Sequence, residues 1–298
     1  MANIIEMIKR IKEFLDLENR VVGINARNRQ LIYPNNPRKD FPLANDKSLT
    51  KKFLEELNIP IPPTYAIISE VGRIEETWKQ MTQYNALAIK PANGKGGGGI
   101  IVLKQIENEW YSFSGRHYSY NKIIRHIANI LFGIYSFGSK DTVIIEYCIQ
   151  PPEFFTAIYQ KGVPDVRIIN YQGIPILAMM RYPTNQSDGK ANLHQGAIGI
   201  AVDIKTGILG MGYNYKGYIS RHPDTDFVFE GLTVPYWQKM LDISILVSKH
   251  FPLKYNGIDI VVDKDMGPVI MELNARPGIE IQNVTQKGLK EIIENLNL

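Results

Sequence analysis

The sequence lacks most of the features that mark secreted, membrane-spanning and nucleic-acid-binding proteins. It has one cysteine, Cys148, so no disulfide can form within the chain, and we expect a reducing compartment, the cytoplasm. No apolar run approaches the roughly 18 residues of a membrane-spanning helix. The run at residues 123–135, for example, is interrupted by Arg125, His126 and Asn129. We therefore expect no membrane span.

Strong charge is also missing. The formal net charge is +4 over 298 residues, with no dense run of lysine and arginine. This balance favours anionic ligands and gives no reason to expect nucleic acid as a partner. The first residues do not have the pattern of a signal peptide, because charged residues interrupt the apolar ones over residues 4–17. The helical spacing of the apolar residues there predicts an amphipathic helix.

Three oxygen-bearing side chains interrupt two apolar segments near the C-terminus. Residues 257–262 and 269–274 are rich in isoleucine and valine and are joined by a turn-forming segment, which predicts a β-hairpin. Asp259 lies on one predicted strand, and Glu272 and Asn274 lie two residues apart on the other, so all three can share one face. Carboxylate and amide oxygens suit Mg²⁺, or Mn²⁺ in its place, held together with nucleotide phosphates. The alternative is a strand with a solvated polar face.

A glycine-rich segment upstream offers a place for phosphates. Residues 87–91 form an apolar strand that contains Lys90, and five of the six residues from 94 to 99 are glycine. Glycines let a loop turn its backbone N–H groups onto an anion, although a flexible linker is the alternative. The segment is not a P-loop, because no helix opens after a Gly-Lys-Ser/Thr sequence. We predict that this loop binds phosphate, through Gly94, Gly96, Gly97 and Gly98.

A third apolar run, residues 143–149, contains a single carboxylate and ends at two prolines. In a nucleotide-binding enzyme such a run can serve as the hinge whose backbone meets adenine. Glu146, Tyr147 and Cys148 would then contact the nucleotide. Taken alone, the run is only a buried strand.

The order and spacing of these pieces resemble the ATP-grasp superfamily, and within it the α-L-glutamate-ligase-like proteins related to the ribosomal-protein glutamate ligase. The resemblance extends from about Leu43 to Leu289. The segments that carry it are residues 46–47 before a helix that ends in Ile-Pro-Ile-Pro at 59–62, residues 89–91 with the glycine loop, 145–147, 165–167, 180–181, 190–196, 257–259 and 271–278.

The resemblance implies an α+β, ATP-grasp fold, in which two subdomains clamp ATP between antiparallel sheets. We expect a short N-terminal segment at 1–45, a subdomain with the glycine loop at 46–145, and a subdomain with the metal site at 146–298. Helices are predicted at 48–57 with a cap near Asp46, and at 121–132, 234–250 and 289–296. Strands dominate residues 144–212.

The resemblance also implies an ATP-dependent carboxylate–amine ligase that forms an amide bond through an acylphosphate and releases ADP and phosphate. Its substrates would be a small-molecule or peptide carboxylate, such as glutamate, and an amine. A small-molecule kinase on the same fold would share the nucleotide site. A non-catalytic ATP-binding subunit is a third possibility, although such a subunit would be expected to have lost a metal ligand or an ATP-binding lysine.

Residue roles follow from this resemblance. Lys47 and Lys90 would bind phosphates, and Mg²⁺ on the three hairpin residues would bridge the β and γ oxygens. Arg181 is assigned to the transferring phosphoryl group and Arg276 to the substrate carboxylate or its oxyanion, because a guanidinium fork matches both. Arg167 is assigned to the nucleotide site, with a structural ion pair to Asp165 or a place at the sheet edge as alternatives.

Four further assignments concern the borders of the site. Lys190 and Asn192 are expected near the phosphates or metal, on a strand that also carries His194. His194 is either a base for the incoming amine or a histidine bonded within a sheet. Glu153 is a ribose ligand or part of a solvated loop.

Few residues precede Asp46, so the acceptor site must differ from that of ligases that carry a larger preceding domain. We consider residues 111–118, the turn at 220–224, a partner protein or a homo-oligomer as its source.

Overall fold

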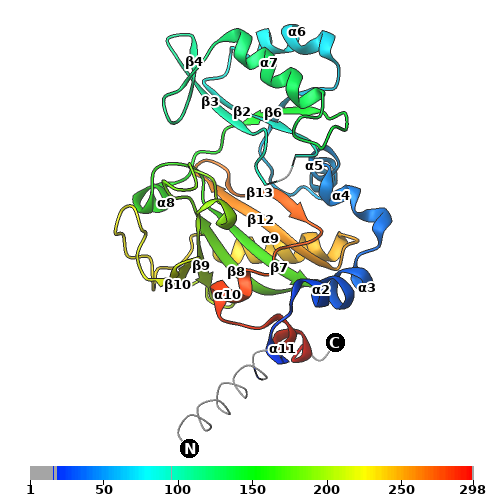
Figure 1. Cartoon of the computed structure of the whole chain (residues 1–298), viewed down its shortest axis with the longest axis vertical. Helices are drawn as coiled ribbons and strands as arrows, with labels where there is room; N and C mark the ends of the chain where they lie inside the picture. The colour runs from blue at the N-terminus through cyan, green and yellow to red at the C-terminus, as the bar shows by residue number, and fades with distance from the viewer. Residues whose placement is uncertain (1–15, 17–18, 95, 297–298) are drawn as a thin grey trace, which may run out of the picture.

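The computed structural model describes residue 16 and residues 19–94 and 96–296, which form two antiparallel sheets, each with its own core (Figure 1). The amphipathic helix predicted at residues 4–17 lies almost wholly outside the described part. Within that part, no helix is long and apolar enough to cross a bilayer.

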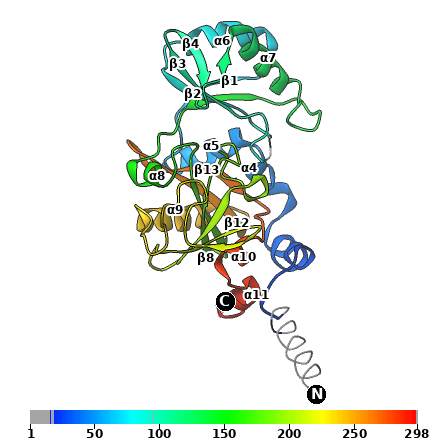
Figure 2. The same ribbon diagram turned by 60° about the vertical axis from the view of Figure 1, so that its left-hand side comes forward.

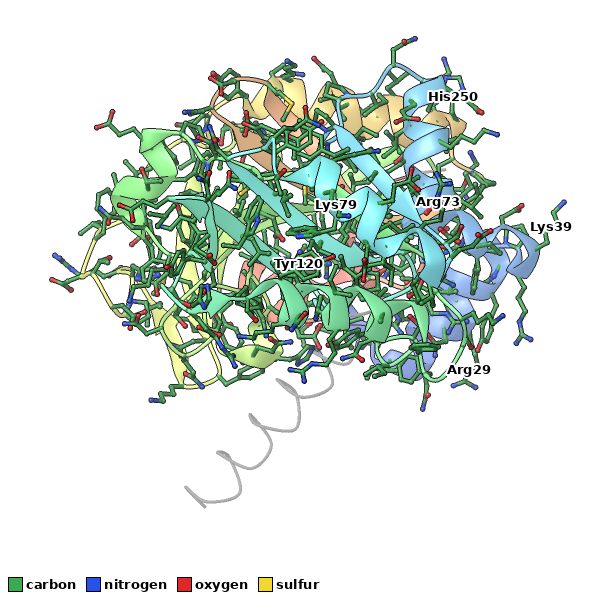
Figure 3. The ribbon with its side chains drawn as sticks, turned by 90° about the horizontal axis from the view of Figure 1, so that it is seen from above. Arg29, Lys39, Arg73, Lys79, Tyr120 and His250 are labelled. Atoms are coloured by element: carbon green, nitrogen blue, oxygen red, sulfur yellow. The ribbon has the colours of Figure 1, made fainter. Side chains whose placement is uncertain are left out.

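The smaller sheet has six strands in the order β1-β6-β2-β3-β4-β5. Helices α6 and α7 cover the face that points away from the larger sheet, as the view from above shows, with Lys79 on α6 and Tyr120 at the start of α7 (Figure 3). Its elements are β1 Thr64–Ile68, α6 Ile74–Met81, β2 Ala86–Pro91, β3 Ile101–Ile106, β4 Glu109–Ser112, β5 His117–Tyr118, α7 Tyr120–Leu131 and β6 Val143–Tyr147, with a short 3₁₀ turn at Val71–Arg73.

Helix α7 shows why this sequence folds as it does. Ile123, Ile127 and Ile130 recur at helical spacing, and all three are fully buried against the sheet. The helix predicted at residues 121–132 is thereby confirmed, beginning one residue earlier and ending one residue earlier than expected.

The larger sheet has seven strands in the order β11-β10-β9-β8-β7-β12-β13, and helix α9 packs against β7, β8 and β12. All nine residues of β12 are buried, because this strand has neighbours on both edges and packing on both faces. The elements are β7 Asp165–Tyr171, β8 Ile174–Tyr182, β9 Ile198–Val202, β10 Leu209–Asn214, β11 Gly217–Ile219, α9 Trp237–His250, β12 Tyr255–Asp263 and β13 Gly267–Asn274.

Short helices surround the larger sheet: α2 Ile24–Ala26, a π-helical stretch Arg27–Ile32, α3 Tyr33–Asn35, a 3₁₀ turn Arg38–Asp40, α4 Pro42–Asn45, α5 Lys47–Glu56, α8 Glu153–Ile158, a 3₁₀ turn Leu193–Gln195, α10 Ile281–Thr285 and α11 Leu289–Glu294. Helix α5 begins where the sequence predicts, because the Asp46 side chain accepts hydrogen bonds from the backbone N–H groups of Ser48 and Leu49 at 2.8 and 3.3 Å.

Helix α5 belongs by packing to the larger sheet, although it lies next to the smaller one in both side views (Figures 1 and 2). Leu54 and Ile59 are part of the larger core, and the rings of Phe53 and Phe251 lie 5.5 Å apart. The smaller core begins with β1. Helix α5 therefore packs on the larger core, and the chain that follows it leads into the first strand of the smaller sheet.

Candidate active site

Lys47 joins the two halves of the predicted site. Its Nζ donates a hydrogen bond to the carbonyl of Gly94 at 2.9 Å and lies 3.4 Å from Oε1 of Glu272. The backbone holds it there, because α5 begins at this residue and its N–H donates to the carbonyl of Ala92 at 3.0 Å. One ammonium group thus lies between the glycine loop of one sheet and the predicted metal strand of the other.

Glu146 is buried between two lysines. Its carboxylate is paired with Lys90 and accepts a hydrogen bond from Lys51 Nζ at 2.6 Å, and Lys51 also donates to the carbonyl of Pro62 at 2.7 Å. Burial raises the pKa of Glu146, but the attraction of Lys90 and Lys51 outweighs it and holds that pKa below its ordinary value. Burial also lowers the pKa of Lys51, an effect that Glu146 partly offsets. Glu146 therefore fixes Lys90 rather than facing solvent.

Sequence reasoning missed Lys51. The available signal was its position four residues after Lys47, which places both side chains on one side of the helix. What the sequence did not reveal is that this side of α5 faces Glu146.

A row of ion pairs crosses the larger sheet. Arg167 binds Asp259 through two hydrogen bonds of 2.7 and 2.6 Å, and Arg181 binds Asp165 through two of 2.6 and 2.5 Å. Arg181 also donates to Asp259 at 2.8 Å. The alternative that pairs Arg167 with Asp165 is wrong, because strand register places Arg167 opposite Asp259, and Asp165 opposite Arg181.

The two buried carboxylates in this row differ in their ionisation. Burial and the nearby charge of Asp259 raise the pKa of Asp165 to about 6, although Arg181 opposes the shift. Burial also disfavours the charge on Asp259, but two guanidinium groups outweigh burial and hold the pKa of Asp259 well below its ordinary value. The difference arises because Asp259 accepts from both arginines and Asp165 from one.

Both arginines keep one nitrogen for a ligand. Their bonds to the carboxylates use Nε and Nη2, so Nη1 of Arg167 and of Arg181 makes no hydrogen bond to another described residue. An anion on this face of the sheet would meet those free donors. Arg181 is thus placed for the role predicted for it, and that role stays a prediction.

The three predicted metal ligands share one face of the hairpin. Asp259 lies opposite Glu272 in the β12–β13 register, and Asn274 lies opposite Gly257. Nδ2 of Asn274 is buried without a hydrogen-bond partner among the described residues, so this donor needs an acceptor such as a phosphate oxygen, whereas Oδ1 is the atom that suits a cation. With two carboxylates and one amide, the set suits Mg²⁺. Glu272 and Asn274 are open to an ion, whereas both oxygens of Asp259 already accept from arginine.

Both ends of the glycine loop are fixed by residues that sequence reasoning did not identify. Asp141 accepts hydrogen bonds from the backbone N–H and the side chain of Asn93, at 3.1 and 3.0 Å. His126 bonds to the carbonyl of Gly99 at 2.9 Å, and a Cβ on Gly99 would lie 2.6 Å from the ring of Tyr135. Gly96 and Gly97 have φ values of 59° and 78°, a conformation that favours glycine. The loop is thus held at both ends by residues far from it in the sequence.

The segment that contains Lys190, Asn192 and His194 is not a strand, and that prediction is wrong. Its last part is a 3₁₀ turn at Leu193–Gln195, because the side chain of Asn192 accepts the N–H of His194 at 3.0 Å and so competes with strand pairing. The segment nevertheless reaches the glycine loop, where Gln195 Nε2 donates to the carbonyl of Gly96 at 3.0 Å.

The remaining predicted residues lie at the borders of the site. Arg276 is exposed at the end of β13, with its guanidinium 4.8 Å from the centre of the Phe41 ring. Glu153 and Lys190 are exposed. Burial and the nearby Asp263 raise the pKa values of Tyr147 and Cys148 to about 12. Tyr147 is the last residue of β6 and Cys148 follows it, so both lie beside Glu146 in the chain.

A family comparison accounts for this arrangement. The family model described as "Sugar-transfer associated ATP-grasp" matches residues 26–297. The chain belongs to the sugar-transfer associated ATP-grasp family. The match covers both sheets and every predicted site residue.

Solved structures show the same ATP-grasp fold at low sequence identity. The biotin carboxylase domain of the Hydrogenobacter thermophilus 2-oxoglutarate carboxylase, in complex with MgADP, ADP and bicarbonate, has a TM-score of 0.52 at 16% identity, covering 87% of this chain and 47% of that one. Biotin carboxylase from Campylobacter jejuni has a TM-score of 0.50 at 17% identity, covering 83% and 43%. The ATP-grasp ligase PsnB has a TM-score of 0.48 at 14% identity, covering 88% and 61%.

This chain therefore spans between about two fifths and three fifths of those three chains. A comparison with curated proteins gives no match.

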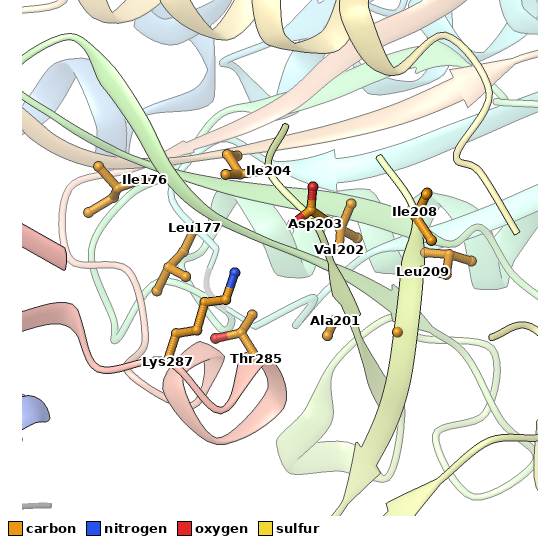
Figure 4. Close-up of a pocket in the computed structure, with 11 residues that line it drawn as sticks. Ile176, Leu177, Ala201, Val202, Asp203, Ile204, Ile208, Leu209, Thr285 and Lys287 are labelled. Atoms are coloured by element: carbon orange, nitrogen blue, oxygen red, sulfur yellow. The ribbon is translucent and has the colours of Figure 1, made fainter. Parts of the chain in front are cut away.

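A cavity of about 220 Å³ lies outside this site, on the larger sheet (Figure 4). Aliphatic side chains of β8, β9 and β10 line it together with Asp203, Thr285 and Lys287. None of the predicted site residues lines it. The residues around Lys47 are thus separate from this mainly apolar cavity.

Proposed function

We propose that this ATP-grasp protein is an ATP-dependent carboxylate–amine ligase that makes an amide bond through an acylphosphate and releases ADP and phosphate. The observation that carries the proposal is the position of Lys47, whose ammonium group contacts both Gly94 of the glycine loop and Glu272 of the metal strand. A triphosphate bound there would have its charge neutralised from both sheets at once.

In this proposal each charged group has a separate task. Lys47 and Lys90 bind phosphate oxygens, and the Lys51–Glu146 pair fixes the position of Lys90. Glu272 and Asn274 would hold Mg²⁺, and Asp259 would join them through an oxygen that also accepts from an arginine. The ion, when bound, neutralises charge on the β and γ phosphates, which is the main work of catalysis in phosphoryl transfer.

The arginines act on the reacting groups. Arg181, held by Asp165 and Asp259, presents Nη1 to the transferring phosphoryl group. Arg276 binds the carboxylate that receives it, and then the oxyanion that forms when the amine attacks. Since carboxylates are unreactive toward amines at neutral pH, the phosphorylated intermediate is the reason that the reaction needs ATP.

The two substrates are a carboxylate and an amine. The family is described by its association with sugar transfer, and we propose that one of the two substrates carries a sugar. Glutamate is a carboxylate to test first, because of the resemblance to the glutamate-ligase-like proteins.

Binding of Mg²⁺ and ATP together is the first expected result. Thermal unfolding in millimolar ATP with Mg²⁺ should occur at a higher temperature than in either alone, because a ligand that binds only the native state stabilises it by about 2.7 kcal/mol at 100 times its Kd. Differential scanning fluorimetry with ATP, ADP, AMP and EDTA arms measures this. An unfolding temperature that is the same in all arms would contradict the proposed function.

The enzyme should release ADP only when a carboxylate and an amine are both supplied.

A further inference from the structure

An exposed aromatic cluster lies beside the proposed nucleotide site and has no role in it. We call it the tyrosine rim, and it consists of Tyr213, Tyr215 and Tyr218 on the β10–β11 hairpin with His194 and Glu280. The rings of Tyr213 and Tyr218 are 5.3 Å apart, and those of His194 and Tyr215 are 6.2 Å apart and stacked. The Tyr215 hydroxyl bonds to Nδ1 of His194 at 2.9 Å.

Contacts on two sides connect the rim to segments of the proposed site. On one side, Gln195, which follows His194 directly, donates to the carbonyl of Gly96 in the glycine loop. On the other side, the Glu280 carboxylate packs against Gly278, two residues after Arg276. A Cβ atom added to Gly278 would lie 2.4 Å from Glu280 Oε2. The rim is therefore connected to the phosphate loop through Gln195, and to the turn that follows Arg276 through Glu280.

Strand register puts the rim on the face of the larger sheet that carries the ion pairs. Tyr218 lies opposite Tyr213, Tyr213 opposite Gly199, and Gly199 opposite Arg181. Gly199 has no side chain, and the space is taken by Leu193 and by Val284 of α10, whose atoms would lie 3.1 and 2.7 Å from a Cβ there. The 3₁₀ turn and α10 thus separate the tyrosines from Arg181, with His194 and Glu280 at the border.

The rim has the chemistry of a cation-binding surface. Glu280 has one ion partner among the described residues, His194 at 3.4 Å, which leaves its second oxygen for a ligand. Tyr215 is 58% exposed and Tyr218 is 44% exposed, so part of each ring is accessible although one side contacts a neighbouring ring. Tyrosine faces attract ammonium groups through the ring quadrupole and also pack against the apolar face of whatever carries the ammonium.

We propose that the tyrosine rim is the site for the amine substrate, and that this substrate is a primary amine on a saturated ring, as in a hexosamine. Its ammonium group lies against the free oxygen of Glu280, and its ring lies on Tyr215 and Tyr218. The ammonium passes one proton to the free oxygen of Glu280, and the resulting amine attacks the acylphosphate carbon, forming the amide bond as inorganic phosphate leaves. This inference rests on the proposed function, and it replaces residues 111–118 and 220–224 as the source of the acceptor site.

The test is a ligand-observed NMR titration of the whole protein loaded with Mg-ADP, using glucosamine, glucose and methylamine. Glucosamine should bind on the order of tenfold more tightly than glucose, which lacks the charge, and than methylamine, which lacks the ring. Glu280→Gln should weaken glucosamine binding on the order of tenfold and leave glucose unchanged. Tyr215→Ala should weaken glucosamine by a similar factor, whereas Tyr215→Phe keeps the ring face and most of the affinity.

Tyr120→Ala is the matched control, because Tyr120 is 44% exposed at the start of α7 on the far side of the smaller sheet. Its glucosamine affinity should equal that of the wild type. Equal affinity for glucosamine and glucose, or an unchanged affinity in Glu280→Gln, would overturn the assignment of the rim. If Mg-ADP binds and glucosamine does not, the rim assignment fails and the ligase proposal stands. If Mg-ADP itself does not bind, the proposed function fails.

Discussion

Glu272→Gln is expected to reduce turnover roughly 100- to 1,000-fold while the protein stays folded, because the change keeps the shape of the side chain and removes one charge from the proposed metal site. The Glu272 side chain is 37% exposed, and its one ion partner among the described residues is Lys47, so little folding free energy depends on it. Steady-state ADP release over a range of Mg²⁺ concentrations measures the effect, with thermal unfolding as the check on the fold.

Asp265→Asn is the matched control, since Asp265 is an exposed carboxylate in the turn of the same hairpin. It should keep wild-type turnover and Mg²⁺ dependence. Asp259→Asn is a less specific variant, because it also breaks the ion pairs with Arg167 and Arg181 and so changes stability. Wild-type turnover in Glu272→Gln would show that the metal site has been assigned to the wrong residues.

Glu146→Gln is expected to destabilise the protein by about 3–5 kcal/mol, the cost of leaving a buried charge without its partner. Here two ammonium groups, those of Lys51 and Lys90, would lose their shared carboxylate, and both are at least nine-tenths buried. Urea unfolding gives the free energy of unfolding of variant and wild type. We also expect weaker ATP binding, because Lys90 loses the contact that positions it.

The pH dependence of the free energy of unfolding distinguishes the buried Glu146 pair from exposed charges. The pKa of Glu146 is lower in the folded protein than its ordinary value of 4.5, so its stabilisation is complete above that pH and is lost as the pH falls through the folded-state pKa. The wild type should therefore lose stability below pH 4.5 more steeply than Glu146→Gln. Glu56→Gln, on the exposed side of α5, should change stability by less than about 0.5 kcal/mol. A similarly small change in Glu146→Gln would contradict the account of a buried cluster.

The parts of the site that sequence reasoning predicted are those set by local pattern. Alternation with a period of two was enough to place Asp259 opposite Glu272, and the glycines at 94–99 indicated a loop between two paired strands. Asp46 before a helical pattern was enough to place the start of α5. These features depend on backbone geometry over a few residues, which one sequence encodes directly.

The parts that were missed depend on tertiary contacts. Lys51 has the same local pattern as an exposed lysine, and only its packing under β6 makes it a partner of Glu146. Asp141 and His126 hold the glycine loop across separations of 48 and 27 residues, which no local pattern shows. The strand predicted at 190–194 was wrong because the Asn192 side chain accepts a hydrogen bond from the N–H of His194. The alternation of residue types does not show that this local bond replaces strand pairing.

Trapping of the intermediate tests the ligase assignment most directly. The enzyme is incubated with Mg-ATP and each of a panel of carboxylates, glutamate among them, with and without hydroxylamine. ADP, phosphate and hydroxamate are measured together. The account predicts little net ADP from the carboxylate alone, and hydroxamate with ADP and phosphate in equal amounts when hydroxylamine is added. A stable phosphorylated product, with ADP but neither free phosphate nor hydroxamate, would contradict the ligase assignment and indicate a kinase on the same fold.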